Sequence, residues 1–191
     1  MAGTGKSGEY PEKISTFLSD KINFVKDTFG PESSEYRALS LQYIKQSFEN
    51  IKTEEHNRRH WEADVIANIG ENIETLHGME RLYNRTLCVE PTMICSCHCR
   101  YCLRGNYDIF TLSKKELAAI ANYCGNFGKA TGIDEILITG GDPLIVPDLL
   151  NYFINCIIEL APNIKVIRIA TRMITHDPDR IGNTFFNILK Q

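Results

Sequence analysis

The sequence predicts an α/β fold with a parallel sheet, preceded by a helical region. Two observations support this fold class. Residues 86–190 alternate short apolar runs, typical of buried strands, with segments of helical periodicity, whereas the segments before residue 80 show helical periodicity alone. Single helices between successive strands predict right-handed crossovers between parallel strands. The predicted domains are therefore an N-terminal helical region over 1–80 and an α/β region over 81–191.

Composition places the chain among soluble globular proteins, since it has 191 residues, 43% hydrophobic and 24% charged. A complete eight-unit β/α barrel needs about 250 residues, so the length excludes it. The formal net charge of −3 supplies no overall field for a phosphate backbone, and nucleic acid is not an expected partner. We expect a cytoplasmic protein without a membrane partner, because no stretch approaches the roughly 20 apolar residues of a transmembrane helix.

Three helices are expected in the N-terminal region. Apolar residues recur at helical spacing from Ile14 to Phe29, and Gly30-Pro31 then ends the first helix. More polar helical patterns predict a second helix over 35–49 and a third over 54–76.

Three strands are expected in the α/β region, over 86–89, 135–139 and 165–171. A capping box formed by Ser113 and Glu116 opens the helix after the first strand, which ends near Gly128 or Gly132. Asp148 is expected to cap the helix after the second strand, which runs to about residue 160. A last helix is expected over 179–190.

Four of the seven cysteines fall within eight residues, on a connection of about 20 residues after the first strand. In a reducing compartment such crowding indicates metal binding rather than disulfides. Two interpretations remain open. Cys95, Cys99 and Cys102 can supply three thiolates to an iron–sulfur cluster, or Cys95 or Cys97 can join His98, Cys99 and Cys102 in a zinc site.

The second predicted strand is also followed by an unusual loop, Gly140-Gly141-Asp142-Pro143. In parallel α/β sheets ligands bind at the carboxyl ends of the strands, and glycines let the backbone approach a ligand closely. The two loops are thus expected to meet at one edge of the sheet. Arg172, at the end of the third predicted strand, would by itself be a surface charge.

The stretch Cys95-Ser-Cys-His-Cys99-Arg-Tyr101-Cys102 resembles the Cys-x3-Cys-x-aromatic-Cys signature of the radical S-adenosylmethionine superfamily. Residues from about 81 to 181 resemble the lysine 2,3-aminomutases of that superfamily. The resemblance implies a partial (βα) barrel of the radical S-adenosylmethionine type. It also implies a [4Fe-4S] cluster held by Cys95, Cys99 and Cys102, whose remaining iron binds S-adenosylmethionine.

The resemblance further assigns residues to ligands. Implied contacts to S-adenosylmethionine are Tyr101, Gly140, Gly141, Asp142 and Arg172, and Arg104 is implied at the substrate carboxylate. Arg81, Tyr83 and Arg85 resemble the family stretch that contacts pyridoxal phosphate. Cys97 and His98 occupy variable positions of the signature and are expected to be bystanders, while Cys124 and Cys156 are expected to be ordinary buried thiols.

The activity implied is that of a radical isomerase. A 5′-deoxyadenosyl radical would take a hydrogen atom from an amino acid and allow 1,2-amino migration, with pyridoxal phosphate as second cofactor and a one-electron reductant such as a flavodoxin or ferredoxin. Different radical chemistry on the same cluster is an alternative, and a zinc-binding structural module is another. No lysine here matches the family's Schiff-base lysine, so the chain is expected to be incomplete for catalysis and to need an oligomer or a completing chain. A Gly141→Val change is expected to weaken S-adenosylmethionine binding and spare the cluster.

Overall fold

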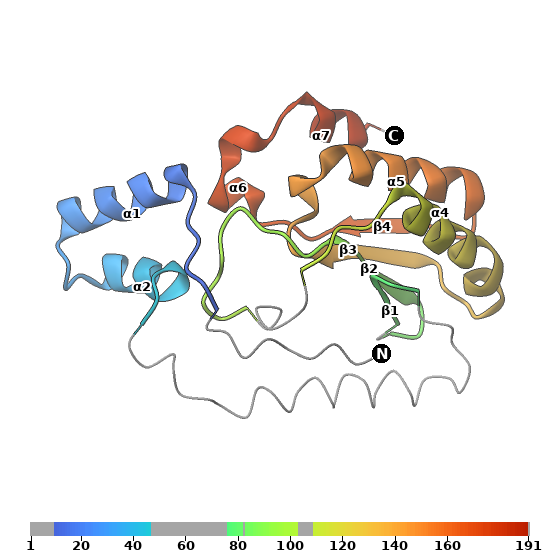
Figure 1. Cartoon of the computed structure of the whole chain (residues 1–191), viewed down its shortest axis with the longest axis horizontal. Coiled ribbons are helices and arrows are strands. Elements are labelled where there is room, and N and C mark those ends of the chain that lie inside the picture. The colour runs from blue at the N-terminus through green and yellow to red at the C-terminus, as the bar shows by residue number, and fades with distance from the viewer. Residues whose placement is uncertain (1–9, 47–75, 82, 103–108, 191) are drawn as a thin grey trace.

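The computed structural model describes residues 10–46, 76–81, 83–102 and 109–190. Two regions are visible in Figure 1: a pair of N-terminal helices, and a sheet with helices packed on one side of it. The long loop that carries the cysteines runs between them. The predicted α/β class is confirmed, with helices preceding the sheet.

The sheet has four strands in the order β1-β2-β3-β4. Their bounds are β1 Met79–Glu80, β2 Thr86–Thr92, β3 Glu135–Gly140 and β4 Val166–Ile169. Strands β2, β3 and β4 are parallel, as predicted, whereas β1 pairs with β2 in the antiparallel direction. Strand β1 was not predicted, because two residues carry no periodicity. The sheet therefore begins two residues before the predicted domain boundary at 81.

Helices α4 (Lys114–Tyr123) and α5 (Pro147–Leu160) cover one face of the sheet, together with α7 (Asn183–Ile188) (Figure 1). The predicted capping box is confirmed: the Ser113 hydroxyl accepts from the Glu116 N–H, and the Glu116 carboxylate accepts from the Ser113 N–H. A π-helical turn, η4 (Cys124–Gly128), extends α4. The expected cap at Asp148 is wrong, since α5 begins at Pro147 after Val146 and Asp148 lies within the first turn. A carboxylate there still favours the helix through its dipole.

The main core lies between the sheet and these helices. Its fully buried members include Leu87, Val89, Ile136 and Ile138 from the strands, and Phe153 from α5. All seven residues of β2 are buried, which marks it as a central strand covered on both faces. The predicted burial of Cys124 and Cys156 is confirmed.

The chain after β4 is more broken than expected. In place of one helix over 179–190 there are two short ones, η6 (Pro178–Arg180) and α7, and a further short helix that was not predicted, α6 (Met173–His176), precedes them. Pro178 and Gly182 account for the interruptions, because a proline cannot continue a helix and a glycine weakens one. The third strand also ends at Ile169, two residues earlier than predicted.

The N-terminal helices are α1 (Thr16–Phe29) and α2 (Ser34–Tyr43). Helix α1 agrees with its prediction, and Ser15 caps it. The expected end of the second helix near residue 49 is wrong, because the backbone turns extended at Ile44. The third expected helix lies outside the described residues, apart from Leu76, which is not helical.

A second, smaller core joins the helical pair to the cysteine loop. It consists of Leu18, Ile22, Tyr43 and Cys97, with Cys99 packed against it. The early end of α2 follows from this packing, since the turn after Tyr43 lets Ile44 lie against the same cluster. The helical pair is thus a support for the loop.

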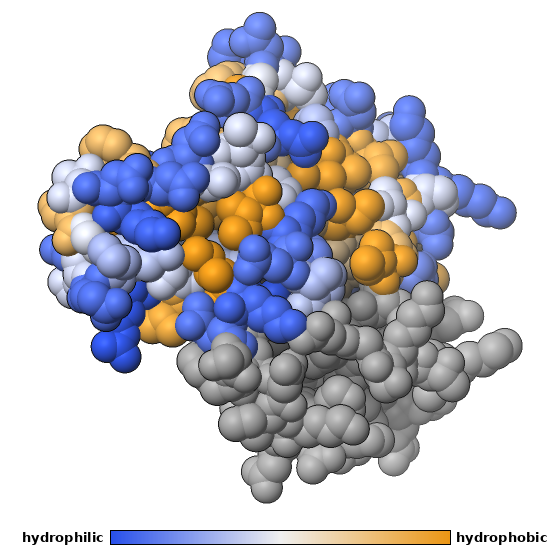
Figure 2. Space-filling view, turned by 60° about the vertical axis from the view of Figure 1, so that its left-hand side comes forward, coloured by the Kyte–Doolittle hydropathy of each residue, from blue (hydrophilic) through white to orange (hydrophobic). Residues whose placement is uncertain are grey.

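Exposed apolar side chains lie in separate groups on the face shown in Figure 2. Large exposed apolar residues of the described chain include Phe24 on α1, Val166 on β4, Ile174 on α6 and Phe186 on α7. None of the helices described by the structure is both long and apolar enough to cross a membrane.

Candidate functional site

The cysteine loop is closed at its base beside the carboxyl end of β2. Thr92 and Thr111 form an antiparallel bridge, and their hydroxyls lie 2.8 Å apart. The Met93 N–H donates to the Phe110 carbonyl at 2.9 Å, and the Leu112 N–H donates to the Pro91 carbonyl at 2.8 Å. The loop therefore leaves the sheet and returns to it at one place, as expected for a functional loop at this edge.

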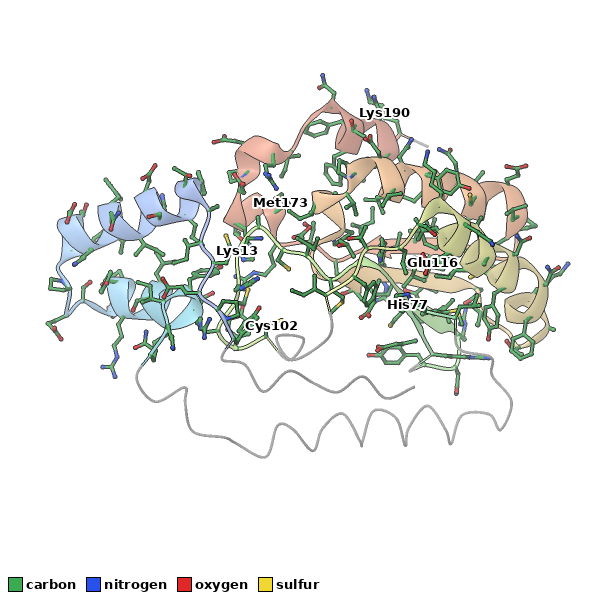
Figure 3. The ribbon with its side chains drawn as sticks, in the orientation of Figure 1. Lys13, His77, Cys102, Glu116, Met173 and Lys190 are labelled. Atoms are coloured by element: carbon green, nitrogen blue, oxygen red, sulfur yellow. The ribbon has the colours of Figure 1, made fainter. Side chains whose placement is uncertain are left out.

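Residues far away in the sequence hold the backbone of this loop. The Lys13 ammonium donates to the Cys95 carbonyl at 2.6 Å, and the Lys13 carbonyl accepts from the His98 N–H at 2.8 Å. From α2, the Gln42 carbonyl accepts from the Arg100 N–H at 2.8 Å. Figure 3 shows Lys13 and Cys102 in the region between the helical pair and the sheet.

Cys95, Cys99 and Cys102 are half-buried and form no disulfide, whereas Cys97 is only 1% exposed. Burial is the main cause that raises the pKa of Cys95 to about 12, and the charges of Asp142, Cys102 and Cys99 raise it further. Burial also raises the pKa of the Tyr10 hydroxyl, and all three cysteines add to that effect. The three thiols thus lie within electrostatic reach of one another and of Tyr10.

Three cysteines on one loop are a donor set that an iron–sulfur cluster can use. In the part of the chain described here, no three His, Cys, Asp or Glu side chains converge closely enough to hold one metal ion. A [4Fe-4S] cluster binds each cysteine through a different iron, so its sulfur ligands need not converge on a point. Grouped thiolates repel one another, and bound cations relieve that repulsion.

Cys97 and His98, which the zinc alternative would use, are engaged elsewhere. The Cys97 Sγ accepts from the Ser15 N–H at 3.2 Å and donates to the His176 carbonyl at 3.7 Å. The His98 ring stacks on Tyr10 with centroids 4.8 Å apart, and its Nδ1 lies 2.9 Å from the Pro11 carbonyl oxygen. A zinc site through either side chain would have to break these contacts.

Gly140 and Gly141 allow the loop after β3 to pack directly against the start of the cysteine loop. A Cβ added at Gly141 would lie 2.4 Å from the Ile94 carbonyl oxygen and 2.5 Å from the Met93 carbonyl carbon. At Gly140, φ is +105°, and a Cβ would lie 2.6 Å from the Thr92 carbonyl oxygen. The expectation that Gly141→Val spares the cluster stays a prediction, but the added side chain would collide with the backbone that leads into Cys95.

Asp142 connects the loops after β3 and β4. Its side chain is buried, and it accepts from the Leu144 N–H at 3.0 Å and the Arg172 N–H at 2.8 Å. The Thr171 hydroxyl lies 2.8 and 2.9 Å from the two carboxylate oxygens. Both oxygens are therefore engaged by protein donors, and Asp142 fixes the loop on which Arg172 stands.

The Arg172 guanidinium reaches from the end of β4 to the cysteine loop and to α2. Its Nη1 donates to the Cys99 Sγ at 3.2 Å and contacts the Tyr101 hydroxyl. Its Nη2 donates to the Tyr43 hydroxyl at 2.8 Å. Tyr101 is 61% exposed, so one face of its ring is free for a ligand. The structure thus brings Tyr101, Asp142 and Arg172 together at the cysteine loop, whereas Arg104 lies outside the described residues.

His176, at the end of α6, is a site neighbour that the sequence interpretation missed. It is 2% exposed, and its Nε2 lies 3.6 Å from the Cys99 Sγ. Burial, and then the charge of Arg172, lower its pKa to about 4, so the ring is neutral at neutral pH. The sequence signal was the four-residue spacing from Arg172, but so short a helix was not predicted.

The residues that resemble a pyridoxal phosphate contact lie at the other end of the sheet. Arg81 donates to the Asn84 and Thr131 carbonyls at 3.0 Å each, and Arg85 pairs with Asp134. Both arginines precede β2, whose seven residues span about 23 Å at about 3.3 Å per residue. Tyr83 is exposed beside them. These described residues do not fit a pyridoxal phosphate site next to the cysteines.

Comparison with curated proteins finds aminomutases that match part of this chain. The L-lysine 2,3-aminomutase of Bacillus subtilis is 32% identical over 117 residues, which are 60% of this chain and 24% of that protein. The L-lysine 2,3-aminomutase of Buchnera aphidicola is 31% identical over 115 residues, 59% of this chain and 33% of that protein. The glutamate 2,3-aminomutase of Clostridioides difficile is 31% identical over 116 residues, 58% of this chain and 26% of that protein. No protein-family model matches the sequence.

The Cys-x3-Cys-x2-Cys loop at the carboxyl end of the first parallel strand resembles the signature of the radical S-adenosylmethionine superfamily. Part of the chain is similar to curated lysine 2,3-aminomutases. It spans about a quarter to a third of the length of the curated relatives it matches.

Proposed function

We propose that the chain binds a [4Fe-4S] cluster and S-adenosylmethionine and serves a radical aminomutase that acts on an amino acid. The observation that carries this proposal is the cysteine loop at the carboxyl edge of the sheet, in contact with the loops after β3 and β4. Relatives with this signature are named for lysine and for glutamate, so the proposal names the substrate class rather than one amino acid.

Three residues would hold the cluster: Cys95, Cys99 and Cys102. When bound, the cluster and S-adenosylmethionine would supply the radical chemistry, with the electron coming from an external one-electron reductant. The chain's own residues position and shield this chemistry. Tyr101 offers an exposed ring to the adenine, and Arg172 and the loop of Gly140 and Gly141 border the place where the cofactor would lie.

Burial on the α1–α2 side protects the loop from water. The second core closes this side through Cys97 and Tyr43, and Cys99 packs against that core while it stays half-buried. Such shielding favours a radical enzyme, because water and oxygen compete for reactive intermediates.

The test is anaerobic reconstitution of the full chain with iron and sulfide. We expect about four irons per chain, broad visible absorbance, and cleavage of S-adenosylmethionine to 5′-deoxyadenosine after reduction with dithionite. Cys99→Ala should lose most of the iron and all of the cleavage, while Cys156→Ala, a buried thiol on α5, should keep both. A colourless wild-type chain with a single tightly bound zinc would establish the structural zinc module instead.

Candidate amino acids added to the reconstituted chain test the reaction separately from the cofactors. An isomerised product with the amino group on the neighbouring carbon would support the aminomutase reaction. Cofactor cleavage with every amino acid, but without isomerisation, would favour a radical enzyme of different reaction.

A further inference from the structure

His176 lies in a position that no part of the proposed cofactor chemistry requires. It ends α6 and is 2% exposed. Its Nε2 is 3.6 Å from the Cys99 Sγ, and its Nδ1 has no hydrogen-bond partner in the described structure. With Nδ1 unprotonated, the ring proton resides on Nε2 and points toward the sulfur.

Both the backbone and the ring of His176 are held by neighbouring residues. Its N–H donates to the Arg172 carbonyl at 2.9 Å. Its carbonyl accepts from the Ser15 hydroxyl at the start of α1, and from the Cys97 thiol at 3.7 Å. The ring packs edge-on against Tyr43, with centroids 5.4 Å apart. A side chain fixed this firmly keeps one orientation toward Cys99.

Cys99 therefore receives two donors from a single turn of chain. Arg172 Nη1 approaches its sulfur at 3.2 Å and His176 Nε2 at 3.6 Å. The structure describes no comparable donor at the Sγ of Cys95. This asymmetry distinguishes Cys99 from Cys95 among the proposed cluster ligands.

We propose that His176 is a positioning residue that donates its Nε2 proton to the Cys99 sulfur and thereby raises the reduction potential of the bound cluster. This inference rests on the proposed function, since it presumes that Cys99 binds iron. A hydrogen bond to a ligand sulfur withdraws electron density and stabilises the reduced, more negative cluster. Ser15 and Cys97 contribute by fixing the turn that carries the imidazole.

The experiment compares the full-length wild type with His176→Gln, His176→Leu and His98→Leu after anaerobic reconstitution. Glutamine keeps an N–H near the position of Nε2, and leucine keeps the bulk without a donor. His98→Leu is the matched control, because this second histidine of the site stacks on Tyr10 and makes no described contact with a cysteine sulfur. The readouts are iron content and the reduction potential from redox titration followed by electron paramagnetic resonance.

We expect all four chains to hold equal iron. In His176→Leu the equilibrium between reduced and oxidised cluster should shift about tenfold toward the oxidised form, which is 59 mV for a one-electron couple. His176→Gln should restore most of the wild-type potential, and His98→Leu should match the wild type. A potential unchanged in His176→Leu, or changed equally in His176→Gln, would overturn the inference while leaving the cluster assignment intact.

A second measurement tests the inference even if His176→Leu loses its iron. Wild-type chain labelled with 15N-histidine should show a weak nitrogen hyperfine coupling to the reduced cluster, and His176→Gln should lack it. Its absence in the wild type overturns the inference. A strong coupling typical of direct ligation, with iron lost from both His176 variants, would make His176 a ligand and also overturn it. A wild-type chain that binds no iron overturns the proposed function and this inference together.

Discussion

Replacing Gly141 with alanine should displace the cysteine loop. The added Cβ would lie 2.4 Å from the Ile94 carbonyl oxygen, 2.5 Å from the Met93 carbonyl carbon and 2.6 Å from the Ile94 nitrogen. An ordinary contact begins at 3.4 Å, so the backbone must move by about 1.0 Å, the difference between 3.4 and 2.4 Å. All three atoms belong to the main chain, and no side-chain rotation can relieve the collision.

The expected cost is large for a single methyl group. Overpacking in a well-packed region costs about 1–3 kcal/mol, and we expect the upper part of that range because both partners are backbone. The Asp142 N–H, which donates to the Ile94 carbonyl at 2.9 Å, would lose its geometry as well. Movement of residues 93 and 94 shifts Cys95, so the iron content should fall together with the stability.

The assay is urea denaturation of the full chain, together with iron analysis after reconstitution. Gly182→Ala is the matched control, because a Cβ at Gly182 meets no atom within 4 Å and its φ is −97°. We expect Gly182→Ala to hold as much iron as the wild type. If Gly141→Ala retained full iron and a free energy of unfolding equal to that of Gly182→Ala, the proposed contact between the two loops would be refuted.

Three further changes test other parts of the structure. Cys97→Ser should keep the iron, because Cys97 is buried in the second core and is not one of the proposed ligands. Its free energy of unfolding, measured by urea denaturation, should fall by about 1 kcal/mol. Iron loss as complete as in Cys99→Ala would instead make Cys97 a ligand. Asp142→Asn should lower the free energy of unfolding by about 2 kcal/mol, since an amide nitrogen would face the Arg172 N–H or the Thr171 hydroxyl; an unchanged denaturation midpoint would contradict this. Hydrogen bonds from the Ser113 hydroxyl, and then from its N–H, lower the pKa of Glu116 from 4.5 to about 2. The stability that this pair contributes is therefore present above about pH 4.5 and is lost as the pH falls toward 2. The difference in stability between wild type and Glu116→Gln should therefore be larger at pH 7 than at pH 3, and an equal difference at both would exclude the capping box as its source.

Much of the fold could be predicted because the signals were local and strong. Strand β3 coincides with the predicted apolar run, and α4 begins at the predicted capping box, which is present in the structure. Predictions failed where tertiary contacts decide. Helix α2 stops at Tyr43 although no glycine or proline follows at once, because Tyr43 and Ile44 pack against Leu18 and Cys97. Periodicity within one segment cannot report a contact with residues more than 50 positions away.

The site shows the same division between local and distant information. The spacing of Cys95, Cys99 and Cys102 is a local pattern, and topology alone predicted that the loop after β3 would lie near it. The place of Arg172 after β4 was implied only by the family resemblance. The sequence did not reveal that Gly141 faces the backbone of Met93 and Ile94 rather than open space for a ligand. It also gave no reason to choose His176, because the short helix that orients the ring depends on hydrogen bonds to α1 and to the cysteine loop.

Alternate cysteines of the loop have different surroundings. Cys97 points into the core shared with α1 and α2, while Cys95 and Cys99, two residues to either side, remain half-buried. Hydrogen bonds from the Ser15 N–H and to the His176 carbonyl anchor Cys97, and this anchor limits the movement of the loop on either side of it. A cysteine that binds no iron can therefore shape the cluster site as strongly as one that does. Its anchor also reaches the carbonyl of His176, so the packing of the N-terminal helices, the orientation of the loop and the donor at Cys99 depend on one another.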